Sequence, residues 1–260
     1  MTTPAKSRLD VLVVERGLAS SRERARALIL AGRVLANEQK IDKPGAPIPA
    51  DADLRLLGED QPYVSRGGLK LAAALDAWKI SVEGRSCLDV GASTGGFTDC
   101  LLQHGATHVT AVDTGFGQIA MKLRNDPRVR LIERTNARLL APGELNHEPA
   151  PTLLVMDVSF ISATLVLPAV LAAAPPLREA VVLVKPQFEA GREHVGKGGI
   201  VRDPAARQLA IDRVAQCVRE LGGEVAGVID SPITGMEGNK EFLLYGRLFP
   251  PAPLATLKTA

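Results

Sequence analysis

Cysteine is scarce in this chain, and its few cysteines are too far apart to act together. Cys87, Cys100 and Cys217 are the three cysteines among 260 residues, and the four histidines show no ligand spacing either. An odd number of dispersed cysteines excludes a disulfide framework and a zinc-ligand pattern. We therefore expect reduced structural thiols in a cytoplasmic protein, and no metal site.

Net charge is also nearly absent, because 31 Lys and Arg residues stand against 29 Asp and Glu residues. The resulting charge of +2 identifies no partner. Its distribution is uneven, since residues 1–33 hold Lys6 and six arginines against only Asp10, Glu15 and Glu23. Such a segment favours a polyanion as partner, although a solvated helix face has the same composition.

Uninterrupted apolar runs are missing as well. The first residues, MTTPAKSRLD, lack the apolar core of a signal peptide. Residues 158–177 carry no charge over about the length that crosses a bilayer, but Pro168, Pro175 and Pro176 interrupt them. Because strand-like runs flank this segment, we expect a buried loop and helix there, and no membrane partner.

The first sixty residues predict a small α+β unit. Leu9, Leu12 and Val13 have helical spacing, and the S-x-x-E pattern from Ser20 to Glu23 predicts the start of a second helix. The segment VLANEQKI then favours a hairpin, and residues 43–57 favour turns followed by a short strand.

Residues 8–39, RLDVLVVERGLASSRERARALILAGRVLANEQ, resemble an S4 domain, which is a small RNA-binding module. The resemblance implies a basic helix face laid on RNA phosphates, with salt-dependent affinity and little sequence information. The alternative is that the arginines only solvate a helix. The residues expected to contact RNA, one of them beyond the module, are Arg8, Arg22, Arg26, Arg33 and Arg66.

From Gly84 onward the sequence alternates between strand and helix patterns. Apolar runs predict strands at 87–90, 108–112, 129–133, 153–156 and 180–184, and helices at 96–103, 119–124 and 204–221. Two late strands, 224–229 and 241–245, have no helix between them and therefore have to pair antiparallel. This order predicts an α/β fold with a Rossmann-like, mostly parallel, doubly wound sheet. We expect an S4-like domain at 6–63, a linker and helix at 64–82, and the α/β domain at 83–250.

The stretch LDVGASTGGF, residues 88–97, joins the first of these strands to a helix through small residues. No lysine follows Gly96, so the turn is not a triphosphate-binding P-loop. Ser93 stands where a dinucleotide site normally has glycine, which disfavours NAD without excluding it. S-adenosylmethionine has an adenosine and an amino-acid end but no phosphate, so it suits this turn.

Polar residues at the ends of later strands extend the candidate cofactor site. Asp113 ends the second strand and could bind a ribose diol, and Asn136 lies where an adenine edge would fall. A strand-ending acid that caps the next turn is the ordinary alternative for Asp113 and Asp157. The expected cofactor contacts are Gly91, Ser93, Gly95, Gly96, Phe97, Asp113, Asn136, Asp157 and Phe160.

Four ionisable residues, Lys70, Asp157, Lys185 and Glu241, stand at the ends of predicted elements. Taken singly, each is more typical of a structural or surface position. A doubly wound sheet can bring such ends to one crevice, so together they predict a catalytic group. A lysine there can act as a general base if its pKa falls through burial or a neighbouring cation.

These four residues resemble the Lys-Asp-Lys-Glu tetrad of the FtsJ-like ribose 2′-O-methyltransferases. With the S4-like module in front, the chain resembles the TlyA family, because VSRGGLKL, LDVGASTGGFTD, ERTNAR, DVSFIS, VKPQFEAG and GNKEF stand in family order. The resemblance implies methyl transfer from S-adenosylmethionine to a cytidine 2′-hydroxyl of ribosomal RNA, 16S, 23S or both. Ribosomal RNA or a ribosomal subunit would be the partner.

Within that resemblance, our hypothesis makes Lys185 the base, while Lys70 and Glu241 orient the ribose. Asp157 would position both Lys185 and the methyl donor. Other functions stay open on the sequence. An RNA-binding assembly factor without catalysis would have a broken tetrad, and here it is intact. A cytolysin, suggested by the family's second label of hemolysin, would need a secretion signal or a membrane-active helix.

Overall fold

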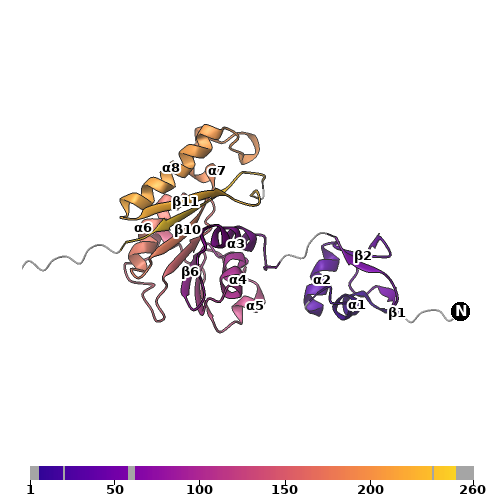
Figure 1. Cartoon of the computed structure of the whole chain (residues 1–260). Coiled ribbons are helices and arrows are strands. Elements are labelled where there is room, and N and C mark those ends of the chain that lie inside the picture. Colours follow the sequence, from indigo (N-terminus) through magenta and orange to yellow (C-terminus); the bar gives the residue numbers. More distant parts are fainter. Residues whose placement is uncertain (1–5, 20, 58–61, 236, 250–260) are drawn as a thin grey trace, which may run out of the picture. The chain divides into compact units, whose positions relative to one another are not determined.

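The chain forms two compact units, Met1–Gln61 and Pro62–Ala260, in the computed structural model (Figure 1). The structure describes residues 6–19, 21–57, 62–235 and 237–249. In the first unit, the helices α1 (Leu9–Glu15) and α2 (Arg22–Leu30) pack over a core that includes Leu9, Val13 and Ile29. Its strands are β1 (Lys6–Arg8), β2 (Val34–Ala36), β3 (Gln39–Lys40), β4 (Pro47–Pro49) and β5 (Leu54–Leu56).

The strands of the first unit form two small antiparallel sheets, β1–β4 and β3–β2–β5. The turn between β2 and β3 holds Asn37 at φ 50° and Glu38 at φ 63°, the left-handed pair that a two-residue hairpin turn requires. The predicted hairpin is therefore confirmed, and so is the predicted pair of helices before it.

The N-cap of α2 is Ser21, whose side chain accepts a hydrogen bond from the N–H of Arg24 at 3.1 Å. Ser20, which the S-x-x-E spacing selected, lies outside the described residues. Both serines are chemically able to cap a helix, so the spacing pattern alone could not decide between them.

Asp10 is fully buried in the first unit and joins α1 to α2. Its carboxylate accepts hydrogen bonds from Arg8 at 2.9 and 3.0 Å and from Arg22 at 3.0 Å. The hydrogen bond from Arg8 is the main reason that the pKa of Asp10 falls to about 2. Asp10 therefore remains an anion at any ordinary pH.

The second unit is built on a seven-stranded sheet in the order β11-β12-β10-β9-β6-β7-β8. All neighbours are parallel except β12, which is antiparallel to both β10 and β11, as the late strands predicted. The predicted strands are confirmed, with ends that move by one or two residues. They are β6 (Ser86–Val90), β7 (His108–Val112), β8 (Val129–Ile132), β9 (Leu153–Met156), β10 (Glu179–Val184), β11 (Glu224–Asp230) and β12 (Phe242–Arg247).

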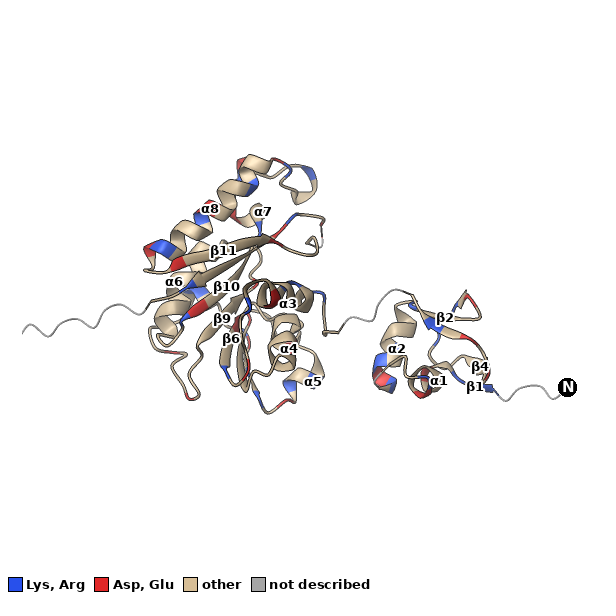
Figure 2. Cartoon of the chain, in the orientation of Figure 1, with Lys and Arg blue, Asp and Glu red and all other residues tan. Residues whose placement is uncertain are grey.

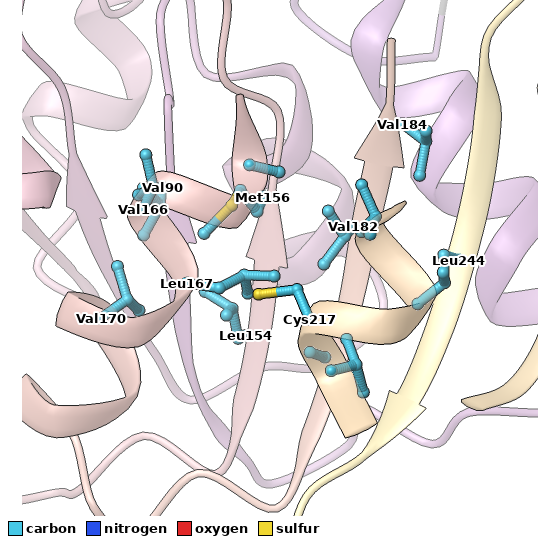
Figure 3. Packing of buried hydrophobic residues seen from close by; sticks show 14 of the residues in the cluster. Val90, Leu154, Met156, Val166, Leu167, Val170, Val182, Val184, Cys217 and Leu244 are labelled. Carbon is cyan, nitrogen blue, oxygen red and sulfur yellow. The ribbon is translucent and has the colours of Figure 1, made fainter. Parts of the chain in front are cut away.

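Helices cover both faces of this sheet. On one face, α6 (Ala163–Ala173) and α8 (Pro204–Glu220) pack on residues such as Leu154, Met156 and Val182 (Figure 3). On the other face, α3 (Gly67–Trp78) and α4 (Gly96–Gln103) pack on alternate residues of the same strands. The short elements are α5 (Met121–Arg124), α7 (Pro186–Glu189), η1 (Ala137–Leu139), η2 (Arg192–His194) and η3 (Lys197–Gly199). Burial on both faces explains why the central strands β9 and β10 are almost continuously apolar.

The uncharged segment 158–177 is a loop followed by α6, as expected, but the loop is exposed at Ser159 and Phe160 and so is not buried as expected. Its helix has 11 residues, and no helix within the described ranges has both the length and the apolarity of a membrane span. Ser162 caps the helix by accepting a hydrogen bond from the N–H of Thr164.

Gly67 and Gly68 lie inside the first turn of α3. Close packing requires glycine at positions 68 and 96. A Cβ on Gly68 would lie 2.2 Å from the ring of Tyr63, and a Cβ on Gly96 of α4 would lie 2.3 Å from Oγ of Ser65. The start of α3 therefore packs directly against the start of α4, and α3 belongs to the second unit.

The three cysteines are free and buried. Burial raises the pKa of the thiols of Cys87 and Cys100 to about 12, so both stay protonated and unreactive. The expectation of structural thiols is confirmed.

We expect Asp10→Asn to destabilise the first unit at neutral pH, because Arg8 and Arg22 would lose their shared carboxylate. The pKa of Asp10 is lowered from 3.8 to about 2, so its stabilisation is complete above the ordinary value and is lost as the pH falls toward 2. The difference between wild type and variant should narrow over that interval in thermal unfolding of the full chain. Glu38→Gln, at an exposed ion pair with Arg55, is the control and should change little. A difference that stays constant down to pH 2 would contradict this account.

Candidate active site

One edge of the second unit's sheet gathers the ends of four strands. Val184 of β10 lies opposite Phe242 of the antiparallel β12, so Lys185 and Glu241 leave the sheet side by side. Met156 of β9 pairs with Val182 on one side and with Val90 on the other, which brings Asp157 to the same edge. Strand order reverses between β6 and β9, the position where open α/β sheets form a ligand crevice.

Lys70 and Glu241 form a buried ion pair at this edge. Lys70 comes from α3, and its Nζ donates a hydrogen bond to Oε2 of Glu241 at 2.5 Å. The side chains are only 11% and 3% exposed. Since the charged groups are shielded from water and aligned, this pair is held firmly in one position.

Lys185 lies close to Asp157 and Ser159. Its Nζ is 2.6 Å from Oδ1 of Asp157 and donates a hydrogen bond to Oγ of Ser159 at 2.6 Å. Among the predicted catalytic side chains, Asp157 is the most open, at 21% exposure against 10% for Lys185. The structure thus arranges the four predicted residues as two lysine–carboxylate pairs, each lysine with its own acid.

The glycine turn after β6 is shaped by the neighbouring strand end. Gly91 has φ 88°, and a Cβ there would lie 2.4 Å from the carbonyl oxygen of Asp157. The N–H of Asp157 in turn donates to the carbonyl of Val90 at 3.0 Å. Gly95 is also left-handed, and a Cβ on it would meet Leu123 at 2.3 Å. No other residue type fits at Gly91 without displacing β9.

Asp113 shapes the same turn from the end of β7. Its Oδ2 accepts the N–H of Ser93 at 2.8 Å, and its Oδ1 accepts the N–H of Gly115 at 2.6 Å. A carboxylate has about four acceptor positions, so each oxygen can still accept a bond from a diol. Asn136 is exposed, and its side chain accepts the N–H of Arg138 at the start of η1.

Two of the residues expected to contact the cofactor are phenylalanines in different surroundings. The ring of Phe97 is 3% exposed and packs in the core of the second unit, so only its backbone faces the turn. Phe160 is 92% exposed, has φ 64°, and places its ring 5.5 Å from that of Phe188. Gly96, another expected contact, has no room for a side chain because Ser65 lies against it. A one-dimensional pattern does not show which way an aromatic ring points.

Asp89, in the middle of β6, was not among the predicted site residues. It is fully buried, Oγ1 of Thr98 donates to its Oδ2 at 2.6 Å, and its Oδ1 has no hydrogen-bond partner among the described residues. Burial raises the pKa of Asp89 to about 7. The signal in the sequence was an acid inside an apolar strand directly before the glycine turn.

The acceptor oxygens around this crevice indicate which hydrogen-bond donors a ligand would need. Three features lie around one turn. Asp89 has a carboxyl oxygen without a hydrogen-bond partner among the described residues, Asp113 has open acceptor positions, and Gly91 has no side chain to fill the space. Such a set suits a ligand that carries a diol and an amino group. The residues present therefore fit S-adenosylmethionine. Among the described residues, no group of three His, Cys, Asp or Glu could hold a metal ion.

The five arginines expected to contact RNA have different surroundings. Arg8 and Arg22 bind Asp10 but remain 53% and 58% exposed. Arg33 donates to the carbonyl of Leu57, and Arg66 donates to that of Thr234. Arg26 is exposed on α2, one turn from Arg22, on the helix whose charges Figure 2 shows. Part of the basic character of this segment therefore serves the fold.

Two protein families match the two units. The model of the FtsJ-like methyltransferase family matches residues 63–248, and that of the S4 domain matches residues 7–54.

Curated relatives match along nearly the whole chain. The 16S/23S rRNA (cytidine-2′-O)-methyltransferase TlyA of Mycobacterium tuberculosis is 46% identical over 93% of this chain and 90% of its own length. Hemolysin A of Brachyspira hyodysenteriae is 43% identical over 92% and 98%. The solved structure of a candidate hemolysin from Streptococcus thermophilus is 44% identical, with a TM-score of 0.70 over 96% of this chain and 91% of that one.

Gly91→Ala should weaken binding of S-adenosylmethionine far more than Gly84→Ala. Both glycines are left-handed, so alanine costs about 1–2 kcal/mol of backbone strain at each. Only at Gly91 does the new Cβ meet a backbone oxygen, whereas nothing lies within 4 Å at Gly84. Isothermal titration calorimetry measures the dissociation constants, with circular dichroism as a check of folding. Equal losses in the two variants would count against the close approach as the cause.

Proposed function

Because this chain belongs to the FtsJ-like methyltransferases that carry an S4 domain, the TlyA family, we propose that it methylates ribosomal RNA. The group transferred is a methyl group from S-adenosylmethionine, and the acceptor is the 2′-hydroxyl of a cytidine in 16S rRNA, 23S rRNA or both. The observation that carries the proposal is the pair of buried lysine–carboxylate contacts beside the glycine turn. The substrate implies a cytoplasmic location.

The residues that would hold the cofactor are those around the turn after β6. Gly91 and Ser93 shape the turn, Asp113 offers acceptors to the ribose diol, and Asp89 offers one buried carboxyl oxygen. Asn136 stands at the end of β8, where an adenine edge would lie. When bound there, S-adenosylmethionine supplies a methyl group carried on a positively charged sulfur.

A ribose hydroxyl is a weak nucleophile, so the site has to remove its proton. Lys185 is suited to this because its amine is nearly buried yet lies beside the most open of the four side chains. Asp157, 2.6 Å away, compensates the positive charge that Lys185 acquires with the proton. We assign the general base to Lys185.

Lys70 and Glu241 have a different part in the proposal. Their aligned hydrogen bond occupies both groups with one another, so they are suited to hold a ribose in place and less suited to exchange protons. Holding the hydroxyl in line with the methyl group contributes much of the rate in reactions of this kind.

The S4 unit would supply affinity for RNA. Its arginines stay half exposed even where they bind Asp10, so they can approach phosphates without breaking the fold. Contacts of this type position RNA and release counterions, but they do not read its sequence. Recognition of the target cytidine therefore falls to the second unit.

The name of one relative, Hemolysin A, favours membrane lysis as a second candidate function. Leakage of dye from phospholipid vesicles tests it directly with the purified chain.

We expect Lys185→Ala and Lys185→Arg each to reduce methyl transfer by about 100- to 10,000-fold, the range for loss of a general base. Arginine keeps the charge but cannot give up its proton in a protein. The measurement is transfer of tritium from labelled S-adenosylmethionine to purified 30S and 50S subunits. Lys79→Ala, which removes an exposed lysine from the same unit, is the matched control. Near-normal turnover of Lys185→Arg would refute the assignment of the base.

Arg26→Ala should weaken binding to ribosomal RNA and reduce the slope of log affinity against log salt by about one. The reason is that one exposed guanidinium would no longer displace a counterion. Filter binding over a series of salt concentrations measures the slope. The control, Arg55→Ala, removes an arginine of the same unit that is already paired with Glu38. An unchanged slope for Arg26→Ala would show that α2 does not contact phosphates.

A further inference from the structure

Two segments that follow neighbouring strands are joined by three side-chain contacts. The β9 loop, residues 157–163, follows β9, and the β10 turn, residues 185–190, follows β10. Lys185 donates to Ser159, Phe188 packs against Phe160, and Glu189 binds the start of α6. The β9 loop and the β10 turn are therefore fixed to each other, and each begins with a catalytic residue of the proposed reaction, Asp157 or Lys185.

The two neighbours of Lys185 contribute differently. Oδ1 of Asp157 lies 2.6 Å from Nζ, but it accepts no aligned hydrogen bond from any described residue. Oγ of Ser159 does accept one, at 2.6 Å. Asp157 thus attracts the lysine by charge, while Ser159 sets the direction in which the nitrogen is held. In the other pair, the carboxylate of Glu241 does both for Lys70.

We propose that Ser159 is a positioning residue for Lys185, an inference that rests on the proposed methyl transfer. A lysine amine ends a flexible four-carbon stem and rotates freely unless an acceptor holds it. The bond to Ser159 holds one N–H of the neutral amine, which limits the directions that its second N–H and its lone pair can take. When Nζ takes up the hydroxyl proton, Ser159 is already in place as an acceptor for the ammonium ion, and such charge-assisted bonds are strong.

Glu189 holds the β9 loop in the position from which Ser159 can bind Lys185. Ser159 and Phe160 are exposed, so packing alone does not hold this part of the β9 loop. Glu189 is 5% exposed and accepts hydrogen bonds from Oγ of Ser162 at 2.5 Å and from the N–H of Ala163 at 2.7 Å. A carboxylate at the N-terminus of α6 is also favoured by the helix dipole. The β9 loop is thereby fixed to the β10 turn three residues after Ser159.

The first test compares Ser159→Ala with Ser159→Thr. Ser159→Ala should lower the single-turnover methylation rate at saturating RNA and cofactor by about 10- to 100-fold, as expected for a lost bond to a charged group. The dissociation constants for S-adenosylmethionine and RNA, and the melting temperature, should not change. Ser159→Thr retains the hydroxyl and should stay within about threefold of wild type. A Ser159→Ala rate near wild type, or an equal loss in both variants, would overturn the proposal.

The second test examines Glu189 through a double-mutant cycle. Glu189→Gln and Ser159→Ala should each slow single turnover, and the double variant should be little slower than Ser159→Ala, because both changes act on the same bond. Rate losses that multiply would show that Glu189 does not act through Ser159.

The third test needs neither RNA nor cofactor. In ¹⁵N–¹H spectra of the lysine side chains, the Lys185 signal, assigned from its absence in Lys185→Arg, should report an ordered amine in wild type and in Ser159→Thr. It should become disordered or exchange faster with water in Ser159→Ala. If wild type methylates no RNA but this change is seen, the proposed function fails and the role of Ser159 stands. If wild type is active and the signal is unaffected, the role of Ser159 fails alone.

Discussion

The site depends on how closely the ends of β6 and β9 approach each other. The carbonyl oxygen of Asp157 lies where a side chain on Gly91 would begin, and the N–H of Asp157 bonds to the residue before that glycine. This contact ties the glycine turn, which is proposed to hold the cofactor, to the strand that precedes Asp157, a proposed catalytic residue. A shift of β9 would therefore displace the glycine turn and the Lys185–Asp157 pair together, so the proposed reaction couples binding of the methyl donor to the position of the base.

The charges in the site are arranged as two compensated pairs. Burying an isolated charge is costly, and even a buried pair recovers little of that cost as stability. Lys70 with Glu241 and Lys185 with Asp157 are therefore better explained by chemistry than by folding. The first unit shows the contrasting case. There Asp10 binds two arginines that remain half exposed, so the same guanidinium groups serve the fold and stay available to a polyanion.

Much of the fold could be predicted because its strands are buried on both faces and read as plain apolar runs. Asp157, Lys185 and Glu241 could be selected because each stands next to such a run, and Lys70 because it stands near the start of a predicted helix. Features that depend on the direction of a side chain could not be predicted from the sequence. Ser159 stands beside a predicted residue but gave no signal of its own, and Phe97 points into the core because α4 turns it there. Asp89 and Thr98 meet only once α4 folds back onto β6. Ser20 and Ser21 were both possible N-caps of α2, and the spacing of residues alone could not identify Ser21 as the cap.

The place of β12 in the sheet has a consequence for the order of events as the protein is made. This strand is the last one that the structure describes, yet it lies between β10 and β11, and the residue before it pairs with a lysine 171 positions earlier. The glycine turn can form long before that, from residues early in the second unit. During synthesis the nascent chain can therefore form the glycine turn and the Lys185–Asp157 pair first, while the Lys70–Glu241 pair stays incomplete until β12 inserts. The pair proposed to hold the ribose is thus completed only after the other strands of the described sheet have been made.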